Sequence, residues 1–386
     1  MAVRLGKRQT YGPGGKVIDI FAIFATLFGS ATSLGLGALQ IGHGLQLVGW
    51  VGETGNRLMI IIITVLTICF ILSAVSGVSK GIQWLSNINM VLAVTLALFV
   101  FVVGPTVFIL NLIPTSLGTY LQELMVMSAR TGTIPGSEDW LAGWTIFYWA
   151  WWVSWTPFVG MFIARISRGR TIRQFVAGVL LIPTVVSLIW FAIFGGAAIN
   201  AERSGAKLSE IESAEGTLFG LLNTLPLATI ASVLVMVLVG IFFVSGADAA
   251  SVVMGTLSEN GTLAPSRPPV IFWGVATGAA AAIMLAIGGE DPLAGLQQVT
   301  IVAALPFLVI MIGMAIALVK DLMKDPMIVR AKYAKAAVEQ AVVEGVRAHG
   351  DDFALAVDQT EPGEGAGALV EIDTPDPTFV GDPTQE

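Results

Sequence analysis

Long uninterrupted runs of apolar residues dominate the chain, without the regularly spaced polar positions of an amphipathic helix or strand. The clearest runs cover residues 60–72, 90–113 and 176–199. The last two reach the roughly 20 residues that a helix needs to cross the ~30 Å hydrocarbon core of a bilayer. A transmembrane β-barrel would instead alternate apolar and polar residues along strands of about ten residues. The pattern therefore predicts an all-α polytopic membrane protein, because helices pair their own backbone groups within lipid.

The apolar runs predict about eight transmembrane helices. Their expected limits are residues 17–46, 57–78, 88–113, 141–165, 171–198, 220–250, 268–288 and 298–320. Two other segments are amphipathic: residues 115–129, expected along the outer membrane interface, and residues 327–348, expected as a basic cytoplasmic helix. That basic helix is either a solvated extension or an arm that senses anionic lipids, and the pattern leaves both interpretations open.

Composition and charge agree with a membrane-embedded chain. Hydrophobic residues make up 55% of the 386 residues and charged residues only 12%, which is too little charge for the surface of a soluble domain. We expect membrane lipids as partners and no nucleic acid. The lone cysteine, Cys69, excludes a disulfide within the chain. No nucleophile–base pair or metal cluster is evident in the sequence, so we do not expect an enzyme.

The distribution of basic residues predicts the orientation in the membrane. If both termini are cytoplasmic, sixteen of the twenty Lys and Arg residues fall on the cytoplasmic side, as expected for a plasma-membrane protein. The predicted organisation is a basic N-terminal segment (1–16), a transmembrane domain (17–320), a basic cytoplasmic helix (321–349) and a disordered acidic tail (350–386).

Tryptophan is concentrated in the fourth expected span. Six of the ten tryptophans lie within residues 140–155: Trp140, Trp144, Trp149, Trp151, Trp152 and Trp155. An aromatic belt at the membrane surface accounts for the first of these, but not for those near the bilayer midplane. The deeper rings either pack between helices or form an aromatic cage. Such a cage suits a quaternary ammonium group, which has no N–H to donate and is recognised by the faces of aromatic rings.

Polar side chains on two other spans are candidate ion ligands. Thr26, Ser30 and Ser33 share one helix face, and their hydroxyl oxygens suit either Na⁺ or hydrogen bonds between helices. The glycines that follow, at 35 and 37, favour close helix approach. Asp248 lies in the sixth span, where a carboxylate is costly; it is either a functional group or anchor of an unwound segment, or an interfacial residue beyond an early helix end.

One long motif carries a resemblance to a known family. Residues 143–173 read GWTIFYWAWWVSWTPFVGMFIARISRGRTIR, and shorter matches are ATLFG at 25–29, GLGALQ at 35–40 and FFVSGADAAS at 242–251. This pattern closely resembles the signature of the betaine/choline/carnitine transporter family, and the resemblance covers roughly residues 16–325.

The resemblance implies a LeuT-like inverted-repeat fold and, for complete members, a trimeric carrier with twelve spans. The implied activity is secondary active transport, with Na⁺ as coupling ion and no organic cofactor, of osmolytes such as glycine betaine, choline, carnitine or ectoine. The implied substrate contacts are Trp149, Trp151, Trp152 and Trp155. The implied sodium ligands are Thr26, Ser30 and Phe158 at one site, and Phe242, Ser245 and Gly246 at another.

The sequence departs from the family pattern in two ways. The match begins at the family's fifth span, so we expect the chain to lack the first four spans. Gly246 stands where a hydroxyl residue is usual, which weakens the second sodium site. The alternatives to a transporter are a non-transporting scaffold, an osmosensing fragment, or one half of a split carrier.

Overall fold

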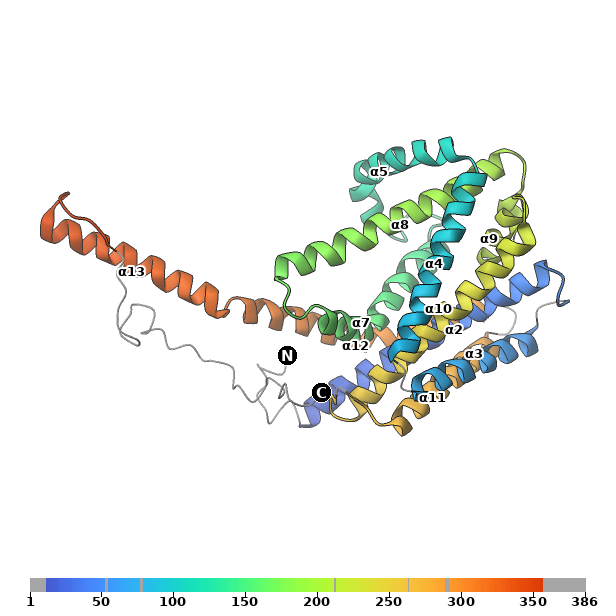
Figure 1. Cartoon of the computed structure of the whole chain (residues 1–386), viewed down its shortest axis with the longest axis horizontal. Coiled ribbons are helices and arrows are strands. Elements are labelled where there is room, and N and C mark those ends of the chain that lie inside the picture. The colour runs from blue at the N-terminus through green and yellow to red at the C-terminus, as the bar shows by residue number, and fades with distance from the viewer. Residues whose placement is uncertain are drawn as a thin grey trace. The chain divides into compact units, whose positions relative to one another are not determined.

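The computed structural model describes residues 12–52, 55–76, 79–211, 213–262, 264–288 and 292–356, and the secondary structure in these ranges is entirely helical (Figure 1). The predicted all-α class is therefore confirmed. Most of the predicted basic segment at 1–16 and of the acidic tail at 350–386 lies outside the described residues.

Helix α2 (Pro13–Leu47) is the most deeply buried helix, and it packs against α3 (Asn56–Ser76), α10 (Ala228–Ser258) and α11 (Arg267–Ile287). Figure 1 shows α2 and α10 running side by side. Small residues on α2 permit this contact, since most of its buried positions are Ala, Gly, Ser or Thr. The sequence-based expectation of close helix approach in this segment is confirmed.

Contacts at two glycines show how close the neighbouring helices lie. A Cβ atom added at Gly35 would come within 2.7 Å of a Leu296 methyl group on α12 (Pro292–Leu322). One added at Gly37 would come within 2.2 Å of the Phe243 ring on α10. These glycines therefore leave space that the neighbouring side chains fill.

A second core joins α4 (Ser79–Val103), α8 (Ile172–Arg203) and α10, while α5 (Thr106–Ser128) packs along α8. The expected span 88–113 is wrong at both ends. Gly104 and Pro105 end α4, because proline has no backbone N–H to continue the helical pattern. The chain then restarts as α5, so the predicted amphipathic segment 115–129 is the second half of a longer helix.

The expected span 220–250 is also corrected. Its first residues belong to α9 (Ala214–Asn223), which follows the short 3₁₀ turn η2 (Leu208–Glu210) and is capped by the Ser213 hydroxyl. The chain breaks around Pro226, and α10 then runs without interruption to Ser258. The structure therefore excludes both an unwound segment at Asp248 and a helix end before it.

Within the described residues, seven helices are long and apolar enough to cross a membrane: α2, α3, α4, α8, α10, α11 and α12. The expected span at 141–165 corresponds to α6 (Glu138–Leu141), the π-helical turn η1 (Ala142–Ile146) and α7 (Phe147–Ile166). It is not among the seven, because its many Trp residues, with Ser, Thr and Pro, lower the mean hydropathy. Its crossing of the membrane stays a prediction.

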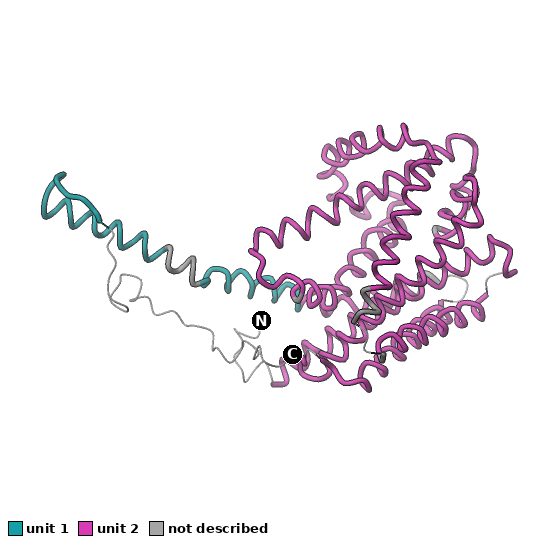
Figure 2. Tube along the Cα trace, viewed as in Figure 1, with its two compact units in different colours: residues 1–7, 310–386 teal, residues 8–309 magenta. Residues whose placement is uncertain are grey.

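The chain divides into two compact units, residues 8–309 and residues 1–7 with 310–386 (Figure 2). The first unit holds α2 to α11 and the start of α12. The second holds the remainder of α12 and α13 (Pro326–His349), which confirms a helix at the predicted positions 327–348. In this unit, the residues after α13 turn back at Gly350 so that the Phe353 ring lies against Gly345.

Candidate functional site

The tryptophan-rich segment forms a continuous row of ring contacts along one side of η1 and α7. We call this set the aromatic row: Trp144, Tyr148, Trp151, Trp155 and Phe158. Consecutive ring centroids lie 5.7, 5.8, 6.1 and 5.8 Å apart, so each ring touches the next. The spacing of three or four residues places all five on one face of the helical segment.

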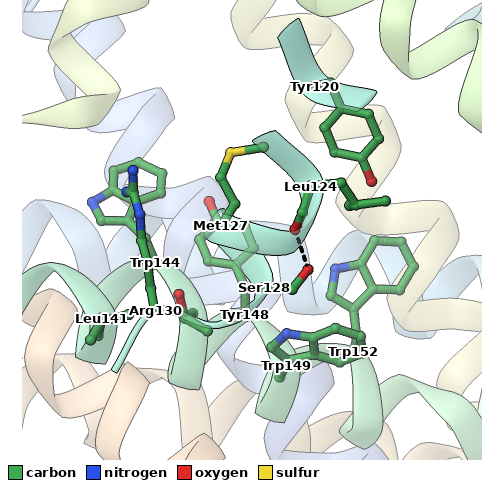
Figure 3. Close-up of a pocket in the computed structure, with 11 residues that line it drawn as sticks. Tyr120, Leu124, Met127, Ser128, Arg130, Leu141, Trp144, Tyr148, Trp149 and Trp152 are labelled. Carbon is green, nitrogen blue, oxygen red and sulfur yellow. Dashed lines mark hydrogen bonds between the residues drawn. The ribbon is translucent and has the colours of Figure 1, made fainter. Parts of the chain in front are cut away.

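Trp149 and Trp152 lie outside the aromatic row, and each is 70% exposed in the described chain. Both face a cavity of about 730 Å³, the large cavity, between α5 and α7 (Figure 3). Its lining residues are Tyr120, Leu124, Met127, Ser128, Arg130, Leu141, Trp144, Thr145, Tyr148, Trp149 and Trp152. Figure 3 shows α5 side chains on one side of this space and α7 side chains on the other.

Aromatic rings and one cation define the chemistry of the large cavity. The Arg130 guanidinium lies 5.7 Å from the centroid of the Trp140 ring, at the start of the same helical segment. The cavity can therefore offer ring faces to a cationic group and a guanidinium to an anionic group.

Trp151 and Trp155 instead point toward α2 and use their indole N–H groups to hold it. The Trp151 Nε1 atom donates to the Ser33 hydroxyl at 3.1 Å, and the Trp155 Nε1 atom donates to the Gly29 carbonyl at 3.3 Å. The structure thus divides the four predicted substrate contacts into two pairs, one at the large cavity and one against α2.

The predicted hydroxyl face of α2 is buried. Thr26, Ser30 and Ser33 are 1%, 8% and 4% exposed. The Thr26 hydroxyl donates to the Ala22 carbonyl at 2.8 Å, and the Ser33 hydroxyl donates to the Gly29 carbonyl at 3.0 Å. Each hydroxyl oxygen keeps lone pairs that can accept further bonds or bind a cation.

Several predicted sodium ligands meet around a second space, the small cavity, of about 10 Å³. Its lining residues are Ser30, Ser33, Leu34, Trp155, Phe158, Phe242, Phe243, Gly246 and Ala247. Thus α2, α7 and α10 all contribute to it. Its volume suits a single water molecule or a small ion, and excludes an organic substrate.

Two predicted ligands lie outside this small cavity. Thr26 lies one helical turn before Ser30 on α2, and Ser245 donates its hydroxyl to the Phe242 carbonyl of its own helix at 2.9 Å.

Pro157 lies inside α7, where it leaves the Val153 carbonyl without its usual helical donor. This carbonyl lies within a continuous helix.

Asp248 is completely buried in α10, so the interpretation of an interfacial residue is wrong. The Ser73 hydroxyl on α3 donates to its Oδ2 atom at 2.7 Å, whereas Oδ1 has no hydrogen-bond partner among the described residues. Sequence reasoning missed Ser73 and Arg130. Ser73 is one of four hydroxyl residues in the expected span at 57–78, so residue type alone does not single it out.

The family model described as BCCT, betaine/carnitine/choline family transporter, matches residues 1–327. Similar curated proteins include the betaine/ectoine transporter LcoP of Corynebacterium glutamicum, 49% identical over 93% of this chain and 58% of that protein. The glycine betaine transporter OpuD of Bacillus subtilis is 46% identical over 81% of this chain and 61% of its own length.

A third relative is the glycine betaine transporter 1 of Vibrio parahaemolyticus, 41% identical over 81% of this chain and 60% of that protein. The chain therefore spans about three-fifths of the length of the three relatives named here.

Proposed function

Because the chain belongs to the betaine/carnitine/choline transporter family, we propose that it takes part in secondary active transport of quaternary ammonium osmolytes across the plasma membrane. The family and the named relatives are transporters, so the chain is not an enzyme. Glycine betaine, choline and carnitine are the proposed quaternary ammonium substrates, and ectoine, an osmolyte without a quaternary ammonium group, is a further candidate.

The observation that carries this proposal is the exposure of Trp149 and Trp152 at the wall of the large cavity. A volume of about 730 Å³ falls in the range of small-molecule sites, about 300–1,000 Å³. Ring faces attract a desolvated trimethylammonium group by about 2 kcal/mol or more. Trp151 and Trp155 have their N–H groups engaged with α2, so we propose that they contribute through their rings. The Trp151 ring contacts Tyr148, which lines the large cavity.

Sodium coupling is a further part of the proposal. Na⁺ prefers oxygen ligands, and the hydroxyl face of α2 lies beside the small cavity at Ser30. Phe158 and Phe242 border the same space, where their backbone carbonyls are the proposed ligands, and Thr26 and Ser245 are proposed to join by small local movement. Na⁺ is the coupling ion in this proposal, and no organic cofactor is invoked.

We also propose an orientation in the membrane and an oligomeric state. We assign both termini to the cytoplasm from the distribution of Lys and Arg. A homotrimer embedded in membrane lipid is the proposed form of the complete carrier.

Uptake of radiolabelled glycine betaine, choline, carnitine and ectoine, with and without Na⁺, tests the proposal in a strain that lacks osmolyte carriers. Trp152→Phe should retain more betaine binding than Trp152→Leu, because only phenylalanine keeps a ring face. Trp84→Leu is the matched control, since Trp84 is exposed on α4, which does not line the large cavity.

Equal effects of the two Trp152 substitutions would show that this ring serves packing and not recognition. Absence of uptake and binding of all four compounds by the wild-type protein would favour a scaffold or osmosensing role.

A further inference from the structure

A short hydrogen-bond network joins the aromatic row to α2. The Trp151 indole N–H donates to the Ser33 hydroxyl at 3.1 Å, and that hydroxyl donates onward to the Gly29 carbonyl at 3.0 Å. The same carbonyl accepts the Trp155 indole N–H at 3.3 Å. Both tryptophans therefore depend on two residues of α2 that are one helical turn apart.

The contact between α2 and α7 is close. A Cβ atom at Gly29 would lie 2.2 Å from the Ser154 hydroxyl oxygen and 3.1 Å from the Trp155 ring, so only glycine fits there. Ser33 and Ser154 are 4% and 0% exposed. Each bond therefore restrains the orientation of its indole ring, because breaking it leaves a polar N–H without its partner on α2.

The network forms part of the wall of the small cavity, which Ser33 and Trp155 both line. Gly29 directly precedes Ser30, which borders the small cavity, and Trp155 borders that cavity too. A cation bound at Ser30 would pull on the α2 backbone next to the Gly29 carbonyl. This is the carbonyl that accepts hydrogen bonds from Trp155 and Ser33. A shift of this turn would move both indole rings. The Trp151 ring lies 5.8 Å from the ring of Tyr148, which lines the large cavity proposed for the substrate.

We propose that Ser33 is a positioning residue that couples cation binding on α2 to the orientation of Trp151 and Trp155. This inference rests on the proposed function and adds to it the residue through which ion and substrate affect each other. Linkage requires the effect to be reciprocal: Na⁺ tightens betaine binding by the same factor by which betaine tightens Na⁺ binding.

Betaine binding to the purified chain, measured in NaCl and in KCl, tests this inference. The wild-type protein should bind betaine about tenfold more tightly with Na⁺, a usual size for such coupling. Ser33→Ala should bind betaine equally in both salts, whereas Ser33→Thr, which keeps the hydroxyl, should restore the sodium effect. Ser251→Ala is the matched control, because Ser251 is also buried and, among the described residues, its hydroxyl bonds only to the Ala247 carbonyl of its own helix.

Trp151→Phe removes the same hydrogen bond from the other side, so it replaces Ser33→Ala if that variant does not fold. It should likewise abolish the difference between the two salts. A sodium effect that survives unchanged in folded Ser33→Ala or Trp151→Phe protein would overturn the inference.

A second readout does not require betaine. In protein labelled with 5-fluorotryptophan, the ¹⁹F signal of Trp151 is identified by its loss in Trp151→Phe. Adding Na⁺ should shift this signal in the wild-type protein and leave it unmoved in Ser33→Ala. If Na⁺ does not shift the Trp151 signal in the wild-type protein, the coupling is contradicted. If Na⁺ shifts the signal but the protein binds no betaine in NaCl or in KCl, only the proposed substrate is refuted.

Discussion

The Ser73 hydroxyl on α3 donates a hydrogen bond of 2.7 Å to the Oδ2 atom of Asp248 on α10, joining residues 175 positions apart. The carboxylate is fully buried, and its other oxygen has no hydrogen-bond partner among the described residues. A buried carboxylate depends strongly on each bond it accepts, because no water replaces a lost partner. The contact therefore joins α3 to α10 inside the protein.

Replacing Ser73 by Ala should destabilise the protein by about 1–3 kcal/mol, the cost of leaving a buried polar group unsatisfied. The melting temperature in detergent measures this change. Thr64→Val is the control on the same helix, because the Thr64 hydroxyl is exposed and donates to the Ile60 carbonyl of α3 itself. Equal melting temperatures for the two variants would refute a stabilising role for the contact with Asp248.

Gly37→Ala should lower stability by about 1–3 kcal/mol, since the added methyl group overpacks the contact between α2 and α10. The new Cβ atom would lie 2.2 Å from the Phe243 ring, which is too close without movement of one helix. Gly246→Ala is the control, because a Cβ there meets nothing within 4 Å. Unfolding measurements should show little loss or a gain for Gly246→Ala, and Phe243→Leu should partly rescue Gly37→Ala.

Thr26→Val should raise the Na⁺ concentration needed for half-maximal betaine uptake while expression stays close to normal. Valine keeps the shape of threonine and removes the oxygen proposed to bind Na⁺. The lost hydrogen bond to Ala22 lies within α2 and does not hold another helix. Sodium titration of uptake provides the measurement, and an unchanged sodium dependence would assign Thr26 to packing.

Much of the fold could be predicted from the sequence because uniform apolar runs of sufficient length have few alternatives to membrane helices. The limits of α4 and α10 were predicted less well. A Gly-Pro pair at 104–105 and the break at Pro226 each interrupt the apolar sequence with only a few residues. They lower the mean hydropathy too little for a pattern of apolar residues to reveal them.

The candidate site could be predicted in part. The tryptophan cluster and the hydroxyl face of α2 follow from residue type and helical spacing. Which rings face α2 could not be predicted, because η1 shifts the helical register before α7 begins and the position of α2 is a tertiary property. The pairing of Ser73 with Asp248 is likewise a contact between distant segments that no local pattern indicates.

Glu259 is expected to stabilise the junction of α10 and α11 in a pH-dependent way. Its carboxylate accepts hydrogen bonds from the Ser266 hydroxyl and, at 2.9 Å, from the Ser266 backbone N–H. These bonds hold the pKa of Glu259 below its ordinary value of 4.5. A lowered pKa in the folded state means that the stabilisation is complete above 4.5 and is lost as the pH falls through the lowered value.

Glu259→Gln should therefore melt below the wild-type protein at neutral pH, and the difference should shrink as the pH is lowered past 4.5. Melting curves across this range measure the effect. Ser266→Ala removes the hydroxyl donor and should reproduce the same pH dependence. A difference that stays constant with pH would show that the bonds to Ser266 do not depend on the charge of Glu259.

The orientation of the chain can be tested across a single helix. Helix α8 connects Arg170 to Ser204 in one pass of 32 helical residues, so these two exposed positions should lie on opposite sides of the membrane. The surplus of basic residues places Arg170 in the cytoplasm and Ser204 outside. The glycines at 169 and 205 are less suitable labelling sites, since both have positive φ angles that a cysteine side chain would strain.

In a Cys69→Ala background, Ser204→Cys should react with an impermeant thiol reagent added to intact cells, and Arg170→Cys should react only after the membrane is permeabilised. Cys69 has to be replaced because its side chain is exposed in the described chain. Reversed labelling would overturn the charge-based orientation while preserving the crossing by α8. Labelling of both positions from outside would instead show that α8 does not cross, because a single pass separates the two positions by the full thickness of the bilayer.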